Sequence, residues 1–193
     1  MRFCGRPMQI SNLRGVRKNS AWGSAYRLAF EEVLRRGQSQ YVIIMDADLS
    51  HDPAELVQLS ELVKHYPAVV GSRYTAGGKV VRWSLPRRLI SRFGNVYARM
   101  LTGVPAADLT RGYAAYQTDW LKRVPFQNMK SDGYAFQIEL KYLLYSLGAK
   151  IYEHPITFEE REKGKSKFSL AIVLEGVWYP LKIFLARITN FKP

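Results

Sequence analysis

The feature of this sequence that most constrains its fold is a pair of short apolar runs, residues 41–45 and 68–71, separated by a helical segment. Unbroken apolar runs of four or five residues are typical of strands covered on both faces. The intervening residues 52–64 begin with Asp-Pro-Ala-Glu, which is a typical helix start. Strand, helix, strand predicts a βαβ unit with neighbouring parallel strands. Asp46 and Ser72 then lie at carboxyl ends, where open α/β sheets bind ligands.

Four further segments predict two helices and two strands around this unit. Residues 20–36 and 133–147 have apolar residues at helical spacing, and each segment is followed by a glycine placed to end the helix. Residues 112–117 and 149–158 are expected to be strands, the second of them interrupted by Pro155.

Residues 86–101 predict a helix with two different faces. One face is apolar and is expected to pack on the domain, whereas the adjoining face is basic. The apolar face consists of Leu89, Phe93, Val96 and Met100, and the basic face consists of Arg88, Arg92, Asn95 and Arg99.

The length of 193 residues and the hydrophobic content of 47% favour one domain over the whole chain, with residues 1–18 as an atypical start. The tail, residues 168–193, is rich in large apolar residues but contains Pro180 and several charges. No uninterrupted apolar stretch is long enough to cross a bilayer. The tail is therefore expected to lie in a membrane interface or to pack on the domain as a helix.

The chain carries 29 basic and 16 acidic residues, and the net charge of +13 implies an anionic partner such as phosphate, nucleic acid or a lipid headgroup. The single cysteine, Cys4, excludes an intrachain disulfide and, with three scattered histidines, the common zinc spacings. Residues 1–10 contain no apolar run of signal-peptide length. These features favour a reducing, cytoplasmic location.

Two aspartates follow the first predicted strand, in the sequence Asp46-Ala47-Asp48-Leu49-Ser50. Carboxylates one residue apart at a strand end can share a magnesium or manganese ion, which in turn neutralises a diphosphate. Acidic residues after strands also form turns, but the position at the ligand-binding edge favours metal binding. Ser50 either completes the metal shell or is an ordinary turn residue. Asp52 is better explained as a helix cap.

Basic residues form a second group. Arg73 follows a predicted strand, Arg88 lies on the basic helix face, and residues 161–167 form a basic loop. Arginine matches phosphate oxygens in two-point hydrogen bonding, whereas lysine acts as a point charge. An anionic acceptor is the simplest ligand for the group, although each arginine taken alone is equally well explained as a solvated surface charge.

Three acidic residues are left without a unique role. Asp132 is a candidate cap for the helix at 133–147. Glu139 is either a partly buried acid facing the site or a surface residue, and Asp108 has a similar ambiguity. Spacing alone assigns neither of the latter two.

Taken together, these segments resemble the polyprenyl-phosphate mannose synthases, also called dolichol-phosphate mannosyltransferases, which are inverting family-two glycosyltransferases with the GT-A fold. The resemblance runs from about Asn19 almost to the C-terminus. The motifs that carry it are Met45-Asp46-Ala47-Asp48-Leu49-Ser50-His51-Asp52-Pro53, Gly71-Ser72-Arg73-Tyr74 with Gly77-Gly78, Ser91 to Asn95, Asp132-Gly133-Tyr134 with Phe136-Gln137-Ile138-Glu139, and Pro155-Ile156-Thr157-Phe158 followed by Arg161, Gly164, Ser166 and Lys167.

The resemblance implies an α/β, GT-A (Rossmann-like) fold with a mixed, mainly parallel sheet, and it implies roles for particular residues. The implied metal ligands for Mg2+ or Mn2+ are Asp46, Asp48 and Ser50; the donor-binding residues are Asp46, Ala47, Asp48 and Asp132; the acceptor-phosphate ligands are Arg73, Arg88, Arg161 and Lys167; and the catalytic residues are Asp46, Asp48 and Arg73.

The implied reaction is metal-dependent, inverting transfer of mannose from GDP-mannose to a polyprenyl (dolichyl-type) monophosphate. It places the chain peripherally on a membrane surface and allows for a membrane-anchoring partner protein. A phosphate monoester is already ionised near neutral pH, so the reaction needs little general base.

The sequence departs from the family at its start. Family members begin with an additional strand and an Asp-Asp-Gly-Ser type stretch, and nothing before Asn19 resembles either. The sheet is therefore expected to lack its first strand or strands. Because the missing part would carry the contacts to the base, glucose transfer from UDP-glucose to the same acceptor class stays open.

Two other classes of function compete with transfer. An inactive remnant that binds anionic membrane through the basic loop and the apolar tail is one alternative. A nucleic-acid-binding module would explain the charge, but the basic residues are spread over several elements and no recognition motif is present. No nucleic-acid partner is therefore expected.

Overall fold

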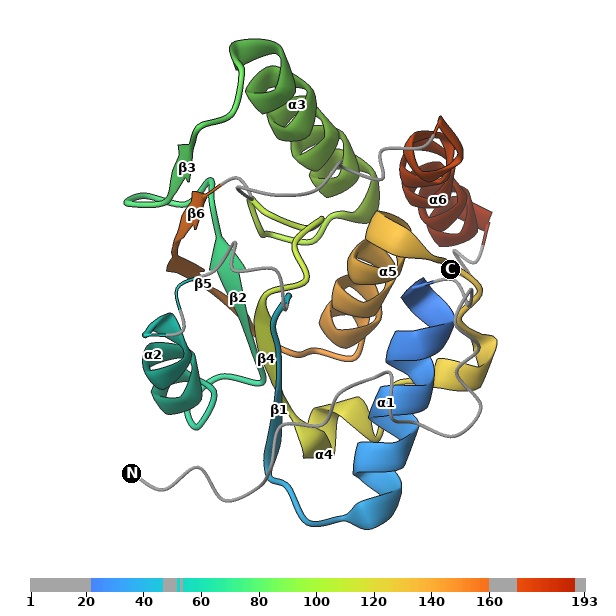
Figure 1. The fold of residues 1–193 in the computed structure, drawn as a ribbon. Coiled ribbons are helices and arrows are strands. Elements are labelled where there is room, and N and C mark those ends of the chain that lie inside the picture. The colour runs from blue at the N-terminus through green and yellow to red at the C-terminus, as the bar shows by residue number, and fades with distance from the viewer. Residues whose placement is uncertain (1–21, 47–51, 53, 160–169, 190–193) are drawn as a thin grey trace.

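The computed structural model of the chain describes residues 22–46, 52, 54–159 and 170–189 (Figure 1). These residues form a four-stranded sheet of order β1-β4-β2-β5, a two-stranded sheet of β3 and β6, and the surrounding helices. In chain order the elements are α1 Trp22–Arg36, β1 Tyr41–Ile44, α2 Glu55–Leu62, β2 Ala68–Ser72, β3 Lys79–Val81, α3 Leu85–Thr102, β4 Ala114–Gln117, α4 Thr118–Leu121, η2 Phe126–Asn128, α5 Gly133–Ser146, β5 Ile151–Pro155, β6 Thr157–Glu159 and α6 Leu170–Thr189.

The main sheet is mixed. β4 pairs antiparallel with both β1 and β2, and β5 pairs parallel with β2, so β1, β2 and β5 run in one direction. The expectation that β1 and β2 are neighbours is wrong, because β4 lies between them. The two strands are nevertheless parallel. Asp46, just after β1, and Ser72, the last residue of β2, therefore lie at the same edge of the sheet.

Helices cover both faces of the main sheet: α2 lies on one face, and α1, α4 and α5 lie on the other (Figure 1). Between these helices and the sheet, Phe30 of α1 packs edge-on against Tyr116 of β4 and stacks on Phe136 of α5. Beneath α2, Leu59 packs with Val69 of β2. These apolar layers remove the sheet from water and hold the strand ends in place.

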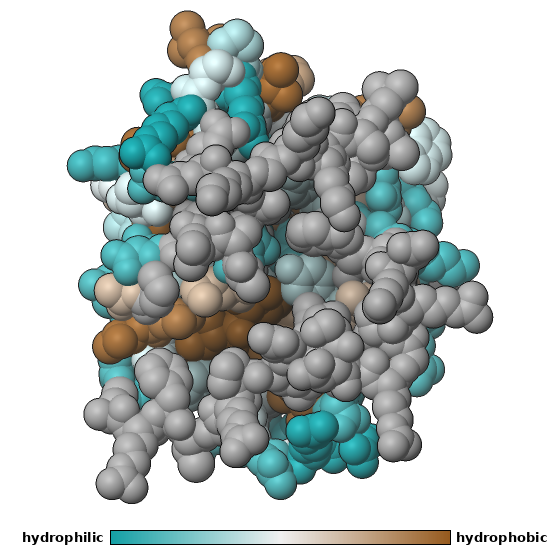
Figure 2. All heavy atoms as spheres, in the orientation of Figure 1, coloured by the Kyte–Doolittle hydropathy of each residue, from teal (hydrophilic) through white to brown (hydrophobic). Residues whose placement is uncertain are grey.

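β1 is less buried than its sequence suggests. It was expected to be covered on both faces, but only Ile44 is buried, because β1 is the border strand of the described sheet. Met45, which follows β1, and Val57, in the neighbouring helix α2, are both exposed. Figure 2 accordingly shows an apolar band on the surface across α2 and β1.

Several predicted boundaries are confirmed. α1 and α5 are followed by Gly37 and Gly148, whose φ angles of 63° and 91° favour glycine. Pro155 ends β5, and β6 begins two residues later and pairs with β3. Asp52 accepts a hydrogen bond from the Ala54 N–H at 2.8 Å, but the cap position of α2 is Ala54, two residues later than predicted.

The predicted orientation of α3 is wrong. The apolar residues expected to pack on the domain face outward, with Phe93 73% and Met100 74% exposed. The buried face instead contains Asn95, Ala98 and Thr102. Small and hydrogen-bonding side chains face the domain because the loop beside α3 presents polar backbone groups to it.

The tail forms α6, which packs against α3 and α5. Tyr179 and Ile183 are buried in that contact, whereas Trp178 and Leu185 face outward. Of the two expectations for the tail, a membrane interface or packing on the domain, one face of α6 packs on the domain and the other is exposed. No helix in the described ranges is long and apolar enough to cross a membrane.

Candidate functional site

Asp46 lies two residues beyond Ile44, the last residue of β1, and beside Arg111. Its side chain is 19% exposed, and it accepts a hydrogen bond from Arg111 Nη2 over an N–O distance of 3.3 Å. Tyr26 of α1 is close enough to be affected, since burial and then the charge of Asp46 raise the pKa of its hydroxyl. The Asp46 carboxylate is thus partly exposed and already contacts a cation.

Arg111 is almost completely enclosed. Its guanidinium carbon lies 4.2 Å from the centroid of the Phe158 ring. Burial and the like charge of Arg73 lower the pKa of Arg111 to about 10, against the opposing effect of Asp46. Since that value is well above neutral pH, Arg111 carries its charge there.

A second ion pair joins Arg73, which follows β2, to Asp108. Arg73 Nε and Nη2 donate to the two carboxylate oxygens at 2.7 and 2.8 Å, and the Arg73 N–H donates to Oδ2 at 3.1 Å. Burial alone would raise the pKa of Asp108, but Arg73 more than offsets this effect and lowers it. Asp108, left open by the sequence, is therefore a fully buried partner that fixes the orientation of Arg73.

The two ion pairs meet at one aromatic ring. The Phe158 centroid lies 5.8 Å from the Arg73 guanidinium carbon and 4.2 Å from that of Arg111. Asp46, from the end of β1, and Arg73, from the end of β2, are thereby brought into one site. Arg111 pairs with Asp46, and its charge also helps to lower the pKa of Asp108, so the charges of Arg73, Asp108, Arg111 and Asp46 alternate in sign.

Three side chains from different elements hold the loop 107–111 that carries Asp108 and Arg111. Glu153 of β5 accepts from the first two backbone N–H groups of this loop at 2.8 and 3.0 Å. Asn95 of α3 accepts from the next two at 2.7 and 3.1 Å. Lys141 of α5 donates to the carbonyls of residues 109 and 111 at 3.0 and 2.6 Å. The loop is therefore held by its backbone, so that the side chains of Asp108 and Arg111 can pair with Arg73 and Asp46.

Sequence reasoning gave no role to Arg111, Lys141 or Glu153. One signal was available for Lys141, which lies three residues after Ile138 and three before Leu144, on the buried face of α5. A charged residue at a core position of a helix indicates a specific buried partner. Arg111 has no such signal, because its partner is remote in sequence.

A pocket of about 260 Å³ opens next to Arg73. Arg88 and Arg92 of α3 line it with cationic groups, and both side chains are exposed. Tyr74 also lines the pocket and donates a hydrogen bond to Ser91 of α3 at 2.7 Å. The remaining lining is apolar and consists of Val80, Leu85 and Leu89. This combination suits an anionic group attached to an apolar chain.

Asp132 occupies the cap position of α5, as the sequence suggests, but its side chain makes no capping hydrogen bond to that helix. Its carboxylate instead accepts from the Gly23 N–H in the first turn of α1 at 2.7 Å. Its own N–H donates to Glu175 of α6 at 2.6 Å. Glu139 is half-buried and accepts from the hydroxyls of Ser131 and Tyr179, so these acids join α1, α5 and α6.

Five of the predicted site residues lie outside the described part of the chain: Ala47, Asp48, Ser50, Arg161 and Lys167. Among the residues that are described, no cluster of three or more histidine, cysteine, aspartate or glutamate side chains could hold a metal. Of the three predicted metal ligands, Asp46 is the one that the structure describes; its carboxylate oxygens are of the kind that Mg2+ and Mn2+ bind, and one of them contacts Arg111. Asp48 and Ser50 would have to complete the set.

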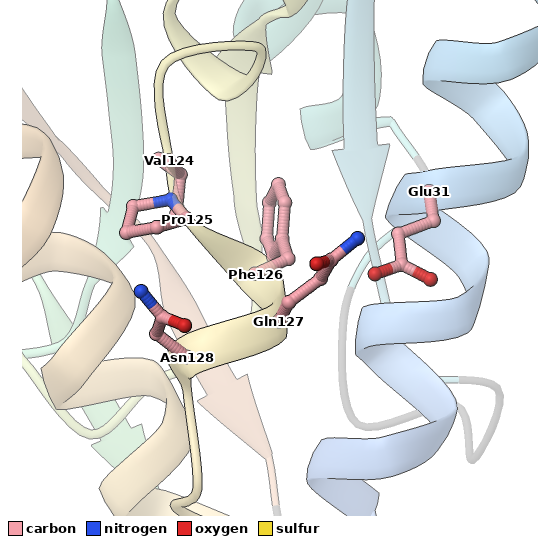
Figure 3. A pocket seen from close by; sticks show the side chains of 6 residues that line it. All are labelled: Glu31, Val124, Pro125, Phe126, Gln127 and Asn128. Carbon is pink, nitrogen blue, oxygen red and sulfur yellow. The ribbon is translucent and has the colours of Figure 1, made fainter.

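A second hollow lies between α1 and η2 (Figure 3). Gln127 points toward Glu31 across it, and the rest of the lining comes from Val124 to Asn128. Glu31 is the sole charged side chain of this lining. An acidic hollow is a poor match for a phosphorylated substrate, so the arginine pocket is the better candidate.

Comparisons with known proteins point to a sugar-transfer family. Residues 10–124 match the family model described as glycosyl transferase family 2. The chain is 43% identical over 155 residues to the undecaprenyl-phosphate mannosyltransferase of Micrococcus luteus, covering 80% of this chain and 63% of that one. It is 41% identical over 157 residues to the polyprenol monophosphomannose synthase of Mycolicibacterium smegmatis, covering 81% and 59%. The chain thus spans about three-fifths of these relatives.

Solved structures show the same fold at low sequence identity. Glucosyl-3-phosphoglycerate synthase from Mycobacterium tuberculosis, solved with Mn2+, UDP-glucose and phosphoglyceric acid, gives a TM-score of 0.54 at 16% identity, over 92% of this chain and 58% of that one. A mycobacterial protein gives 0.56 at 18% identity, over 94% and 56%. The predicted α/β fold of the GT-A class, with a mixed sheet whose strands mainly run in one direction, is confirmed.

Proposed function

Because the chain belongs to glycosyl transferase family 2, we propose that it transfers mannose from GDP-mannose to the phosphate of a polyprenyl (dolichyl-type) lipid, with inversion and with a divalent metal. One observation carries the proposal: Asp46 pairs with Arg111, and Arg111 shares the Phe158 ring with Arg73, which lines a pocket of arginines and apolar side chains. The names of the two curated relatives support the sugar and the acceptor class.

The donor side of the proposed site centres on Asp46. Asp46, Asp48 and Ser50 would hold Mg2+ or Mn2+, and a metal bound there would supply positive charge to the departing diphosphate. Ala47 and Asp132 are proposed to contact the donor as well. Asp132 accepts a hydrogen bond from the first turn of α1. The same helix carries Tyr26, whose pKa is raised by burial and by the charge of Asp46.

The acceptor side is the arginine pocket. Asp108 holds Arg73 in a fixed orientation, and Arg88 adds an exposed, movable cation at the same pocket. Two cations on one phosphate monoester neutralise most of its charge. The fork of Arg88 would orient the phosphate, because Asp108 already occupies Nε and Nη2 of Arg73. Arg161 and Lys167, which lie between β6 and α6 in the sequence, are proposed to complete the phosphate contacts.

The chemistry follows from these positions. An oxygen of the acceptor phosphate forms a bond to the anomeric carbon as the bond from that carbon to the donor diphosphate breaks, and the electron pair leaves with the diphosphate. The acceptor is ionised near neutral pH, so no residue has to remove a proton. The contribution of the residues is then orientation and charge neutralisation.

The proposed acceptor also requires a membrane surface. The outward face of α3 carries Leu89, Phe93 and Met100, next to the pocket that Leu89 lines. An apolar helix face flanked by arginines is typical of helices that lie in a membrane interface with anionic lipids. We propose that the protein binds peripherally through this face, alone or with a membrane-anchoring partner protein.

The test is a transfer assay with vesicles that contain undecaprenyl phosphate. Labelled GDP-mannose and labelled UDP-glucose are supplied separately, with and without MnCl2, and lipid-linked label is counted. We expect metal-dependent transfer from GDP-mannose that exceeds transfer from UDP-glucose. Transfer from UDP-glucose alone would replace the donor assignment, and vesicle binding without transfer from either donor would favour an inactive membrane-binding remnant.

A further inference from the structure

Arg111 is a cation at the donor side of the site, and the proposed function has so far given it no part in the reaction. Its guanidinium lies 3.3 Å from the Asp46 carboxylate that would bind the metal. The position is fixed from two directions, because the guanidinium lies over Phe158 and Lys141 holds the backbone carbonyl of Arg111 at 2.6 Å. A metal bound to Asp46 would therefore meet an arginine already in place.

The surroundings of Arg111 make an anionic partner necessary. The residue is 8% exposed and lies near a second cation, Arg73, which is engaged with Asp108. A buried guanidinium is costly unless an anion contacts it. Asp46 supplies negative charge to Arg111 by direct contact in this structure, and Asp108, which is already paired with Arg73, does so without a direct hydrogen bond. When a divalent cation neutralises Asp46, the contribution of Asp46 is lost.

We propose that Arg111 is a resident counter-cation of the donor site, which pairs with Asp46 before the metal binds and with the donor diphosphate afterwards. This inference rests on the proposed function, since it needs a diphosphate that arrives with a metal. The planar fork of arginine matches two phosphate oxygens, and the diphosphate brings the negative charge that Arg111 requires. Arg111 and the metal then neutralise the same leaving group from different sides.

The proposal predicts effects of opposite sign on two ligands. Before the donor binds, Arg111 competes with the metal for Asp46, so its removal should tighten binding of the metal alone. After the metal binds, Arg111 attracts the diphosphate, so its removal should weaken binding of a nucleoside diphosphate. A residue that merely supports the fold would change both affinities in the same direction.

The experiment compares the full chain with its Arg111→Gln variant. Mn2+ binding without nucleotide is titrated by electron paramagnetic resonance, and GDP binding in saturating Mn2+ is measured by calorimetry. We expect Arg111→Gln to bind Mn2+ about fivefold more tightly or better, and to bind GDP about tenfold more weakly or worse. Inorganic diphosphate in place of GDP should show the same loss, because the proposed contact does not involve the base.

A matched control is Arg123→Gln, which removes the same charge. Arg123 also lies over an aromatic ring, 4.5 Å from the centroid of Trp120, but it is exposed and follows α4 at the opposite end of the sheet. We expect this variant to change both affinities less than twofold. If Arg111→Gln does not fold, Arg111→Met keeps an apolar stem against Phe158 and should show the same opposite shifts.

The outcomes separate the two proposals. Wild-type protein that binds Mn2+ and GDP, with Arg111 variants that shift both affinities in one direction or neither, overturns the role of Arg111 and leaves the proposed function standing. Wild-type protein that binds neither Mn2+ nor GDP overturns the proposed function, and the role of Arg111 with it.

Discussion

Single residues determine how the cations of the site are presented, and Arg73 with Asp108 is the clearest case. Asp108 is fully buried and occupies both Nε and Nη2 of Arg73, so the guanidinium has one orientation. The attraction and hydrogen bonds within the pair offset the hydration that both charged groups lose on burial. Arg73 reaches the pocket from this fixed position, whereas Arg88 reaches it from an exposed helix face.

Replacing Asp108 by asparagine should be strongly destabilising. Arg73 would stay buried without a compensating charge, and we expect the free energy of unfolding to fall by about 3–5 kcal/mol. Urea denaturation measures this loss. Glu61→Gln, which breaks the exposed pair with Lys64, is the control and should cost less than about 1 kcal/mol. Equal losses in the two variants would contradict the role of Asp108.

Lys141 should make the stability of the protein depend on pH. Burial lowers its pKa from the ordinary 10.5 to about 7; Asp108 and Glu153 oppose the shift, and Arg73 and Arg111 add to it. Between these two pH values the unfolded chain binds more protons than the folded chain, so stability should rise with pH in this window, by at most about 1.4 kcal/mol per pH unit.

Urea denaturation at pH 6.5, 8 and 9.5 tests this dependence. Lys141→Met should be less stable overall, because two carbonyls of the loop lose their donor, and it should lack part of the rise seen in the wild type. Lys64→Met removes an exposed lysine and should keep the full rise. Parallel pH profiles for the wild type and Lys141→Met would show that Lys141 does not titrate in this range.

The sequence located some of these residues and missed others for a physical reason. Asp46 and Arg73 were found because each lies within two residues of the end of a recognisable strand, and strand ends mark ligand sites in α/β sheets. Arg111 and Glu153 act through partners that are remote in the chain. Those partners meet only after the sheet and α5 have packed.

At the scale of elements, α3 shows that periodicity finds a helix more reliably than it finds the buried face. The spacing of Leu89, Phe93 and Met100 predicted an apolar stripe, and the stripe is present. The stripe was expected to face the core, because an apolar helix face normally packs inside the protein and the polar face lies in water. The domain instead uses Asn95, whose side chain satisfies backbone groups of the neighbouring loop.

Binding of α3 to a membrane can be tested separately from catalysis. We expect the triple variant Leu89→Gln, Phe93→Gln, Met100→Gln to lose at least about tenfold in affinity for vesicles that contain anionic lipid, because three apolar side chains no longer enter the interface. Sedimentation with vesicles measures the affinity. Val57→Gln, an exposed apolar position on α2, should leave it unchanged. Undiminished binding by the triple variant would exclude α3 as the contact.

At the scale of the whole molecule, the sequence predicted the elements better than their order in space. The strands at 41–44, 68–72 and 151–155 run in one direction, as an α/β pattern requires. The insertion of β4 between β1 and β2 was not predicted, because β4 follows β2 in the chain only after the long α3 segment. Pairing between distant strands depends on which faces must be buried, and local sequence does not specify that.

The two ends of the site, Asp46 and the arginine pocket, belong to one reaction if the proposed function is right. The most direct measurement is the rate of mannose transfer from GDP-mannose to undecaprenyl phosphate in saturating Mn2+ by Asp48→Ala, with Asp119→Ala, an exposed acid beyond the far end of the sheet, as control. We expect the first variant to lose at least about 100-fold in rate, and the control to match the wild type. Wild-type turnover by Asp48→Ala would contradict the proposed donor site.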